Sequence, residues 1–187
     1  MAQANQLIRI ALLGAESTGK SQLSLALMTC LRARGQEVHL VTEYLRSWCD
    51  AQGRTPEPHE QTHIAQHQAN TVLQHASGIV IADTTPLMTA VYSHKLFNDP
   101  SLYAMAAAHQ QVYDMTLVMG LDLPWVADGL QRDGPHVREP VDALLRTALH
   151  SAGVSYKVVY GEGEERLNNA VLALGWDKPS SMTAVNP

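Results

Sequence analysis

The sequence predicts an α/β fold in which a parallel sheet of five strands is covered by helices on both faces. Short apolar segments alternate with longer segments of helical periodicity, which is typical of repeated strand–helix–strand units. A glycine-rich loop directly after the first apolar segment is the second observation, because such loops join a strand to a helix in nucleotide-binding α/β folds. Since connections of this kind are right-handed, we expect the strands to run parallel, with a ligand site at their carboxyl ends.

The 187 residues suit one domain, which we expect over residues 1–177. The expected strands are residues 7–13, 38–41, 78–82, 115–119 and 155–160. The expected helices are residues 20–34, 59–75, 86–94, 101–113, 140–151 and 164–174. Residues 178–187 contain Ser, Pro and Asn with little to bury, and we expect a disordered tail there.

Residues 14–21 fit the phosphate-loop pattern G-x-x-x-x-G-K-[ST], in which backbone N–H groups and a helix N-terminus surround phosphate oxygens. Lys20 is expected to reach the β- and γ-phosphates, and the Ser21 hydroxyl to bind Mg²⁺. The predicted nucleotide-binding residues are Gly14, Ala15, Glu16, Ser17, Thr18, Gly19, Lys20, Ser21 and Gln22. The pattern predicts a P-loop NTPase fold with ATP and Mg²⁺ as cofactors. The alternative, a chance glycine-containing turn, is disfavoured by the strand before the loop and the helix after it.

Two acidic residues follow expected strands at the same sheet edge. Asp83 comes directly after an apolar strand, the Walker B pattern in which a carboxylate holds the Mg²⁺ ligand sphere. Its alternative role is to cap the next helix. Glu43 follows the second strand and is expected to accept or orient the hydroxyl of an acceptor; the alternative is an exposed carboxylate that begins a helix.

Residues 120–135 are too rich in Gly, Pro and charge to belong to a core, and they form a candidate lid over the phosphates. Arg132 is its expected mobile cation, and Arg138 is a second candidate. Trp125 either contacts the ligand or packs within the lid.

A possible metal motif lies in the expected helix at residues 59–75. His59 and His63 match H-E-x-x-H, and His67 follows one turn later. Five-residue patterns recur by chance, and a second catalytic system would have to share a domain already committed to a nucleotide. We therefore favour a solvated helix face rich in His and Gln over a zinc site.

The overall composition excludes several classes of partner. The formal net charge is −5, and no cluster of Lys and Arg indicates a nucleic-acid-binding face. Cys30 and Cys49 are too few for a disulfide framework, which favours a reducing compartment. No signal-peptide pattern or membrane-spanning apolar run is present. We expect a cytoplasmic protein with no membrane or nucleic-acid partner, and the oligomeric state stays open.

The chain resembles the ribosylnicotinamide kinase domain of NadR proteins and their stand-alone relatives among the P-loop kinases. The resemblance rests on the phosphate loop, on Glu43-Tyr44 with Arg46, on residues 81–84, and on Pro124-Trp125-Val126-Ala127-Asp128-Gly129-Leu130. It implies a nucleoside-monophosphate-kinase-like fold with a lid. It also implies transfer of the ATP γ-phosphate to the 5′-hydroxyl of nicotinamide riboside, which gives nicotinamide mononucleotide.

The resemblance also implies roles for individual residues. Lys20, Glu43, Asp83 and Arg132 would be catalytic, and Glu43, Tyr44, Arg46, Trp125 and Asp128 would bind the acceptor. Arg166 would lie near the adenine; its alternative role is a surface ion pair.

Two positions depart from the family pattern. Thr42 stands where members often carry an aromatic residue, and Thr85 where many carry Asp. Contact with an acceptor ring would then fall to Tyr44, Tyr92 or Trp125. The alternatives are a regulatory nucleotide-binding or ATPase module and a kinase of another nucleoside.

Overall fold

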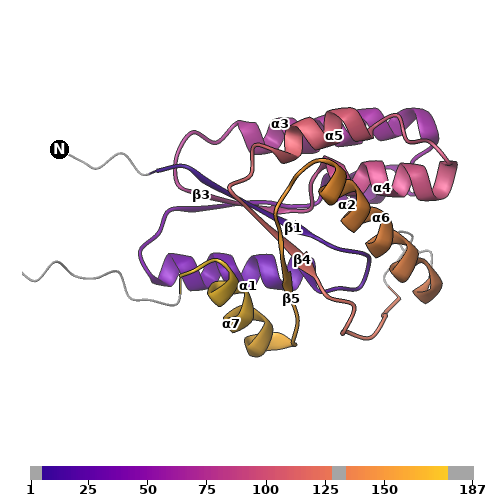
Figure 1. Cartoon of the computed structure of the whole chain (residues 1–187). Coiled ribbons are helices and arrows are strands. Elements are labelled where there is room, and N and C mark those ends of the chain that lie inside the picture. Colours follow the sequence, from indigo (N-terminus) through magenta and orange to yellow (C-terminus); the bar gives the residue numbers. More distant parts are fainter. Residues whose placement is uncertain (1–5, 128–133, 177–187) are drawn as a thin grey trace, which may run out of the picture.

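The computed structural model describes residues 6–127 and 134–176, and its centre is one parallel sheet (Figure 1). The strands are β1 (Ile8–Leu13), β2 (Val38–Val41), β3 (Ile79–Asp83), β4 (Met115–Met119) and β5 (Lys157–Val159). They lie in the order β2-β3-β1-β4-β5, and every neighbouring pair is parallel. The predicted α/β fold with a five-stranded parallel sheet is confirmed.

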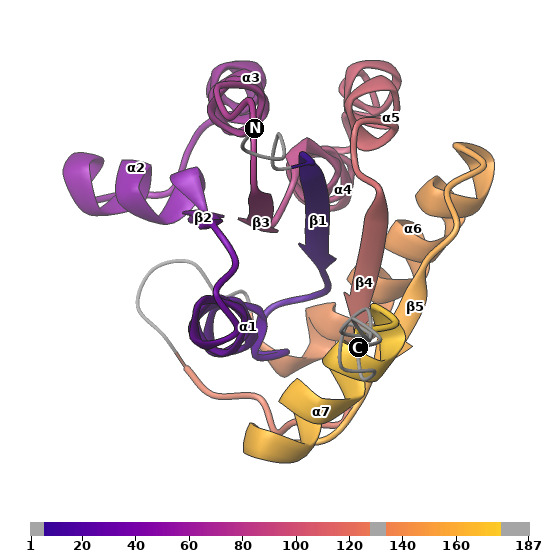
Figure 2. The same ribbon diagram turned by 90° about the vertical axis from the view of Figure 1, so that its left-hand side faces the viewer.

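Helices cover both faces of the sheet (Figure 2). They are α1 (Lys20–Ala33), α2 (Tyr44–Gln52), α3 (Gln61–Leu73), α4 (Pro86–Phe97), α5 (Tyr103–Gln110), α6 (Arg138–Ser151) and α7 (Gly163–Ala173). Two short 3-10 helices, η1 (Pro58–Glu60) and η3 (Pro135–Val137), precede α3 and α6. Helices α1 and α7 pack on one face, and α3, α4, α5 and α6 pack on the other.

The central strand β1 explains why the sheet is buried on both sides. Ile10 and Leu12 belong to the core beneath α1 and α7, whereas Ala11 and Leu13 belong to the core beneath α3 to α6. All four side chains are 0% exposed. Side chains alternate between the faces of a strand, so an unbroken apolar run such as this one is stable only between two helical layers.

The strand order fixes which loops meet. The carboxyl end of β3 lies between that of β1, which leads into the phosphate loop, and that of β2, which leads to Glu43. The Thr84 N–H, just after β3, donates to the Leu12 carbonyl at 3.1 Å and extends the pairing to this edge. The parallel pairing of β2, β3 and β1 therefore brings Glu43, Asp83 and the phosphate loop to one edge of the sheet.

Helix α2 is the element that the sequence did not predict. The expected helices include none between residues 35 and 58, but the helix runs from Tyr44 to Gln52 and ends at Gly53, whose φ is 67°. Cys49 is its buried residue, so the helix has too short an apolar stripe to give a clear periodic signal. Helix α4 also extends to Phe97, beyond the expected end at residue 94.

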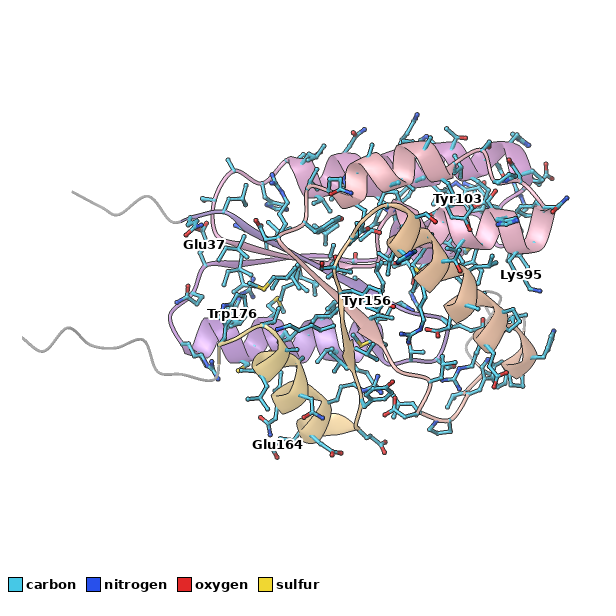
Figure 3. All side chains as sticks on the ribbon, in the orientation of Figure 1. Glu37, Lys95, Tyr103, Tyr156, Glu164 and Trp176 are labelled. Carbon is cyan, nitrogen blue, oxygen red and sulfur yellow. The ribbon has the colours of Figure 1, made fainter. Side chains whose placement is uncertain are left out.

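The end of the described chain is held against α1. The Arg34 guanidinium, just after α1, donates to the Trp176 carbonyl at 2.8 Å, and the Trp176 ring packs on the core beneath α1 and α7 (Figure 3). Within the part of the chain that the structure describes, no helix is both long enough and apolar enough to cross a membrane.

Candidate nucleotide and acceptor site

The loop between β1 and α1 has a backbone that only glycine suits at two positions. Gly14 has a φ of 150°, and a Cβ there would lie 3.0 Å from both Met119 Cβ and Thr18 Oγ1. Gly19 has a φ of 77° and directly precedes α1. Left-handed backbone and close packing both exclude larger residues. The loop is thus held in the shape that turns backbone N–H groups toward an anion.

The ammonium of Lys20 lies over this loop. Its Nζ donates to the carbonyls of Gly14 and Ala15, each at 2.9 Å. Thr18 Oγ1 donates to the same Ala15 carbonyl at 2.7 Å, which fixes the turn from inside. The lysine is therefore already at the phosphate-binding concavity, where a polyphosphate would compete with two carbonyl dipoles for it.

Asp83 has an unused acceptor atom. The residue is 3% exposed, and its Oδ1 has no hydrogen-bond partner within the described chain. A buried carboxylate oxygen without a partner is costly unless a cation or a water molecule occupies the site. Asp83 and Ser21 line the same cavity. Their oxygens are the hard ligands that Mg²⁺ prefers, so this pair fits the metal that the phosphate loop requires.

The phosphate loop opens into a cavity of about 1140 Å³. Small-molecule sites usually measure roughly 300–1,000 Å³, so this one has room for a nucleotide together with an acceptor. One part of its lining is the phosphate loop with Leu123, Pro124, Val126 and Ala127, and a second part comes from α2, α3, α4 and the residues that precede α2 and α4. This second part of the wall includes Glu43, Arg46, Gln68, Thr84, Met88, Tyr92 and Phe97.

Acidic side chains dominate the charged lining. Among the residues that the structure describes, the carboxylates of the lining are Glu16, Glu43, Asp50, Asp83 and Glu162, and its cations are Lys20 and Arg46. Glu43 occupies the N-cap position of α2 without a side-chain capping hydrogen bond, and this half-buried residue lines the cavity. Burial, together with Asp50 and Glu43, raises the pKa of the Cys49 thiol in the same wall, whereas Arg46 and Arg54 act in the opposite direction. That thiol is neutral at physiological pH.

The first part of the candidate lid is hydrogen-bonded to the phosphate loop. Trp125 Nε1 donates to Glu16 Oε1 at 3.0 Å, and Ser17 Oγ lies 2.9 Å from the Val126 carbonyl and 3.0 Å from its N–H. The Glu16 N–H donates to the Tyr92 hydroxyl at 3.1 Å, which ties the loop to α4 as well. The predicted acceptor residue Asp128 and lid cation Arg132 lie outside the described residues.

Two buried arginines fix the residues that lead into this segment. Arg166 of α7 is 3% exposed, and its Nη2 lies 2.8 Å from Asp122 Oδ1 while its Nη1 donates to the Thr18 carbonyl. Arg138 of α6 is 8% exposed, and its Nη1 donates to the Leu123 carbonyl at 2.8 Å. Arg166 is thus a buried link to the phosphate loop and not a surface residue.

The aromatic residues expected at the acceptor divide into two groups. The Tyr44 ring stacks on His67, with centroids 3.6 Å apart, and lines a smaller cavity of about 260 Å³. Among the described residues, Tyr44 and Trp125 do not line the larger cavity, whereas Tyr92 and Phe97 of α4 do. The structure therefore brings Glu43, Arg46 and Asp83 together with the phosphate loop, and it places Tyr44 beside them.

Sequence reasoning gave no role to two residues that hold this site together, Gln68 and Asp122. Gln68 Oε1 accepts from the Tyr44 N–H at 2.8 Å, and Gln68 Nε2 donates to the Thr84 carbonyl at 3.3 Å. Asp122 is the partner of Arg166. Gln68 was detectable, because it is a polar residue in the stripe of buried residues Ile64, Ala65, Ala69 and Val72.

The histidines of the H-E-x-x-H match do not gather around a common point. His67 stacks on Tyr44, and its ring centroid is 6.4 Å from that of His63. Within residues 6–127 and 134–176, no group of three or more His, Cys, Asp or Glu side chains could hold a metal ion.

Fold and loop together define a P-loop NTPase of the kinase-like type. Residues 9–166 match the sequence model of the AAA domain family AAA_28, and the chain belongs to that family. No curated protein matches the chain significantly.

Two solved structures share the fold. A crystal structure of NadR protein in complex with NR has a TM-score of 0.68 and 21% identity, over 91% of this chain and 50% of that one. This chain thus spans about half the length of that NadR chain. Thymidylate kinase from Ehrlichia chaffeensis has a TM-score of 0.64 and 13% identity, over 90% of this chain and 97% of that one.

Proposed function

We propose that the protein is an ATP-dependent small-molecule kinase that phosphorylates the 5′-hydroxyl of nicotinamide riboside and yields nicotinamide mononucleotide. The observation that carries this proposal is the single cavity of about 1140 Å³, which runs from the phosphate loop to Glu43 and α4. A site that only bound or hydrolysed a nucleotide would need no second compartment. The NadR structure was determined with NR, which supports nicotinamide riboside as the acceptor.

The charges of the second compartment support an acceptor that is not anionic. Among the described residues of this part of the cavity, the carboxylates Glu43 and Asp50 outnumber the cation Arg46. A phosphorylated acceptor would meet like charges there, whereas the pyridinium ring of nicotinamide riboside carries a positive charge. Tyr92 and Phe97 provide aromatic faces on the same wall, where a cationic ring gains about 0.5–2 kcal/mol.

Each part of the site has a defined task in this proposal. ATP would supply the phosphoryl group, and Mg²⁺ would neutralise its charge. Gly14 to Lys20 bind the phosphates, and Ser21 with Asp83 hold the metal. Glu43 orients the acceptor hydroxyl and accepts its proton. Trp125 and Val126 close the phosphate side against water, which otherwise competes with the acceptor. We assign Asp128, Arg132 and Arg166 to the same site, and residues 1–177 to one kinase domain.

A coupled assay that measures ADP release tests the proposal against its alternatives. The acceptors are nicotinamide riboside, the common ribo- and deoxyribonucleosides, thymidine monophosphate and simple sugars. We expect turnover to rise sharply with nicotinamide riboside and the product to be its monophosphate. A response to another nucleoside alone would reassign the acceptor. No response to any acceptor, with nucleotide still bound, would favour a regulatory module.

A further inference from the structure

Thr84 adopts a backbone conformation that its residue type disfavours. It follows β3 and has a φ of 75°, in the left-handed region where a β-branched side chain is a clear outlier. Such a conformation is unfavourable for threonine and persists only where its surroundings enforce it. Here the Thr84 N–H donates to the Leu12 carbonyl at 3.1 Å, and its carbonyl accepts from Gln68 Nε2 at 3.3 Å.

The side chain of Thr84 is buried without a hydrogen bond. The residue is 5% exposed and lines the large cavity, but its Oγ1 has no partner in the part of the chain that the structure describes. A buried hydroxyl without a hydrogen-bond partner loses the bonds that it makes to water in the unfolded chain, and this loss destabilises the fold. Strain and an unused hydroxyl therefore occur together at one residue of the cavity wall.

The next residue, Thr85, is also a buried threonine, but its hydroxyl has hydrogen-bond partners within the protein. Thr85 is 0% exposed, but its Oγ1 donates to Gln110 Oε1 at 2.8 Å and accepts from the Leu87 N–H at 3.2 Å. Thr85 caps α4 and closes a network inside the core. The two neighbouring threonine hydroxyls thus differ, because that of Thr85 caps a helix, whereas that of Thr84 has no partner among the described residues.

Thr84 also lies where the two substrates would meet. The end of β3 is between the phosphate loop after β1 and Glu43 after β2. Side chains alternate along β3, so Asp83 lies on the same face as Ile79 and Ile81, which pack beneath α1. Its Oδ1, which has no partner among the described residues, is the expected metal ligand. Thr84 is bound to Gln68 of α3 and shares the cavity wall with Met88 and Tyr92 of α4, on the acceptor side.

We propose that Thr84 Oγ1 hydrogen-bonds a hydroxyl group on the sugar of the acceptor and so selects ribosyl acceptors, an assignment that rests on the proposed kinase function. A hydroxyl both donates and accepts, so it suits a sugar hydroxyl better than a carbonyl or a cation. A bound acceptor would supply the partner that the described residues do not provide. The strained backbone holds Oγ1 in position before binding, which lowers the entropy lost when the acceptor is ordered.

Three substitutions separate this role from a structural one. Thr84→Val keeps the branched shape and removes the hydroxyl, and Thr84→Ser restores the hydroxyl. Thr84→Gly removes the hydroxyl and relieves the positive φ, so it keeps the fold even if the valine variant does not. The control is Thr85→Val, which loses the Gln110 contact and the helix cap. It should lower the Tm without changing the KM of the acceptor.

The assay compares the KM of the ribosyl acceptor with those of its 2′-deoxy and 3′-deoxy analogues. For the wild type and Thr84→Ser, we expect one of the two analogues to have a KM raised roughly tenfold. Thr84→Val and Thr84→Gly should raise the KM of the ribosyl acceptor by a similar factor, abolish the discrimination and leave the KM of ATP unchanged.

Two results would overturn the assignment. If Thr84→Gly retained the wild-type KM and discrimination in an active, folded kinase, the assignment of Thr84 would fail alone. If the wild type showed no acceptor-dependent turnover, the proposed function would fail and this assignment with it.

Discussion

Arg166 Nη2 lies 2.8 Å from Asp122 Oδ1, and through Nη1 the same guanidinium binds the Thr18 carbonyl inside the phosphate loop. Asp122 Oδ2 accepts in turn from the Gly161 N–H at 2.7 Å, and Arg166 Nε donates to the Gly161 carbonyl at 2.5 Å. Partial burial acts to raise the pKa of Asp122, but these hydrogen bonds and the Arg166 charge hold it below its usual value. The loop after β5, the start of the lid segment and the phosphate loop are thus joined through one buried cation.

Asp122→Asn should lower the free energy of unfolding by about 1–3 kcal/mol, because it leaves the buried Arg166 charge without its counterion. Nucleotide affinity should fall as well, since Arg166, which binds the Thr18 carbonyl, is held less firmly without the Asp122 carboxylate. The measurements are urea unfolding and titration with a fluorescent ATP analogue. Asp142→Asn is the matched control. It breaks the Arg146–Asp142 pair within α6 and should cost only about 0.5 kcal/mol. Equal losses in the two variants would contradict the role of Arg166.

Arg138→Met should keep or raise the Tm while lowering turnover. Arg138 is buried, and its Nε and Nη2 have no acceptor among the described residues, so the charge is an unfavourable one to bury. The guanidinium also holds the Leu123 carbonyl, and a methionine would leave this part of the cavity wall less fixed. Differential scanning fluorimetry and the kinase assay give the two readouts. A lower Tm together with unchanged kcat would show a purely structural role.

Trp125 should report nucleotide binding through its fluorescence, because its indole N–H is bonded to Glu16 of the phosphate loop. We expect ATP to change the tryptophan emission of the wild type and of Trp48→Phe, in which the ring that Arg54 overlies on α2 is replaced. Trp125→Phe should lose the change and should weaken ATP binding by a factor of about 2 to 10, the value of one hydrogen bond. If ATP still changed the tryptophan emission of Trp125→Phe, another tryptophan would be the one that responds to binding.

Stability should fall as the pH drops below about 6.5, and His109 should account for part of that fall. Burial and then Arg9 lower the pKa of His109, whereas a contact with the Ala69 carbonyl acts in the opposite direction. The folded state therefore holds the neutral ring and the unfolded state takes up a proton, so the stabilisation is present above pH 6.5 and lost at lower pH.

One such proton contributes a slope of at most about 1.4 kcal/mol per pH unit. Urea unfolding between pH 5 and 8 should show a smaller slope for His109→Gln than for the wild type. His150→Gln, at an exposed position on α6, should keep the wild-type slope. An unchanged slope in His109→Gln would assign the pH dependence to other groups, such as His75, whose pKa is also lowered by burial.

The sheet could be predicted from sequence because its signals are local. Each strand is a short apolar run, and the glycines of the phosphate loop occur at a fixed spacing. Asp83 was placed correctly at the end of a strand, so its position at the carboxyl edge of the sheet followed from the parallel topology alone.

The contacts that depend on distant residues could not be predicted. Nothing near Arg166 in the sequence indicates that it binds Thr18 and Asp122, since these partners come from two other loops. Tyr44 shows the same limit, because its ring direction is set by His67 on another helix. Thr84 looks like an ordinary strand-end residue until its φ of 75° and its missing hydrogen bond are seen.

The central claim is that one site transfers phosphate from ATP to a small acceptor, and it is tested most directly by following the labelled γ-phosphate. The wild type, with ATP, Mg²⁺ and nicotinamide riboside, should convert label into nicotinamide mononucleotide. Lys20→Ala should keep its fold by circular dichroism but lose at least about 100-fold in rate, because the phosphates lose their principal cation. Label that appears only as inorganic phosphate, or transfer that persists in Lys20→Ala, would contradict the account.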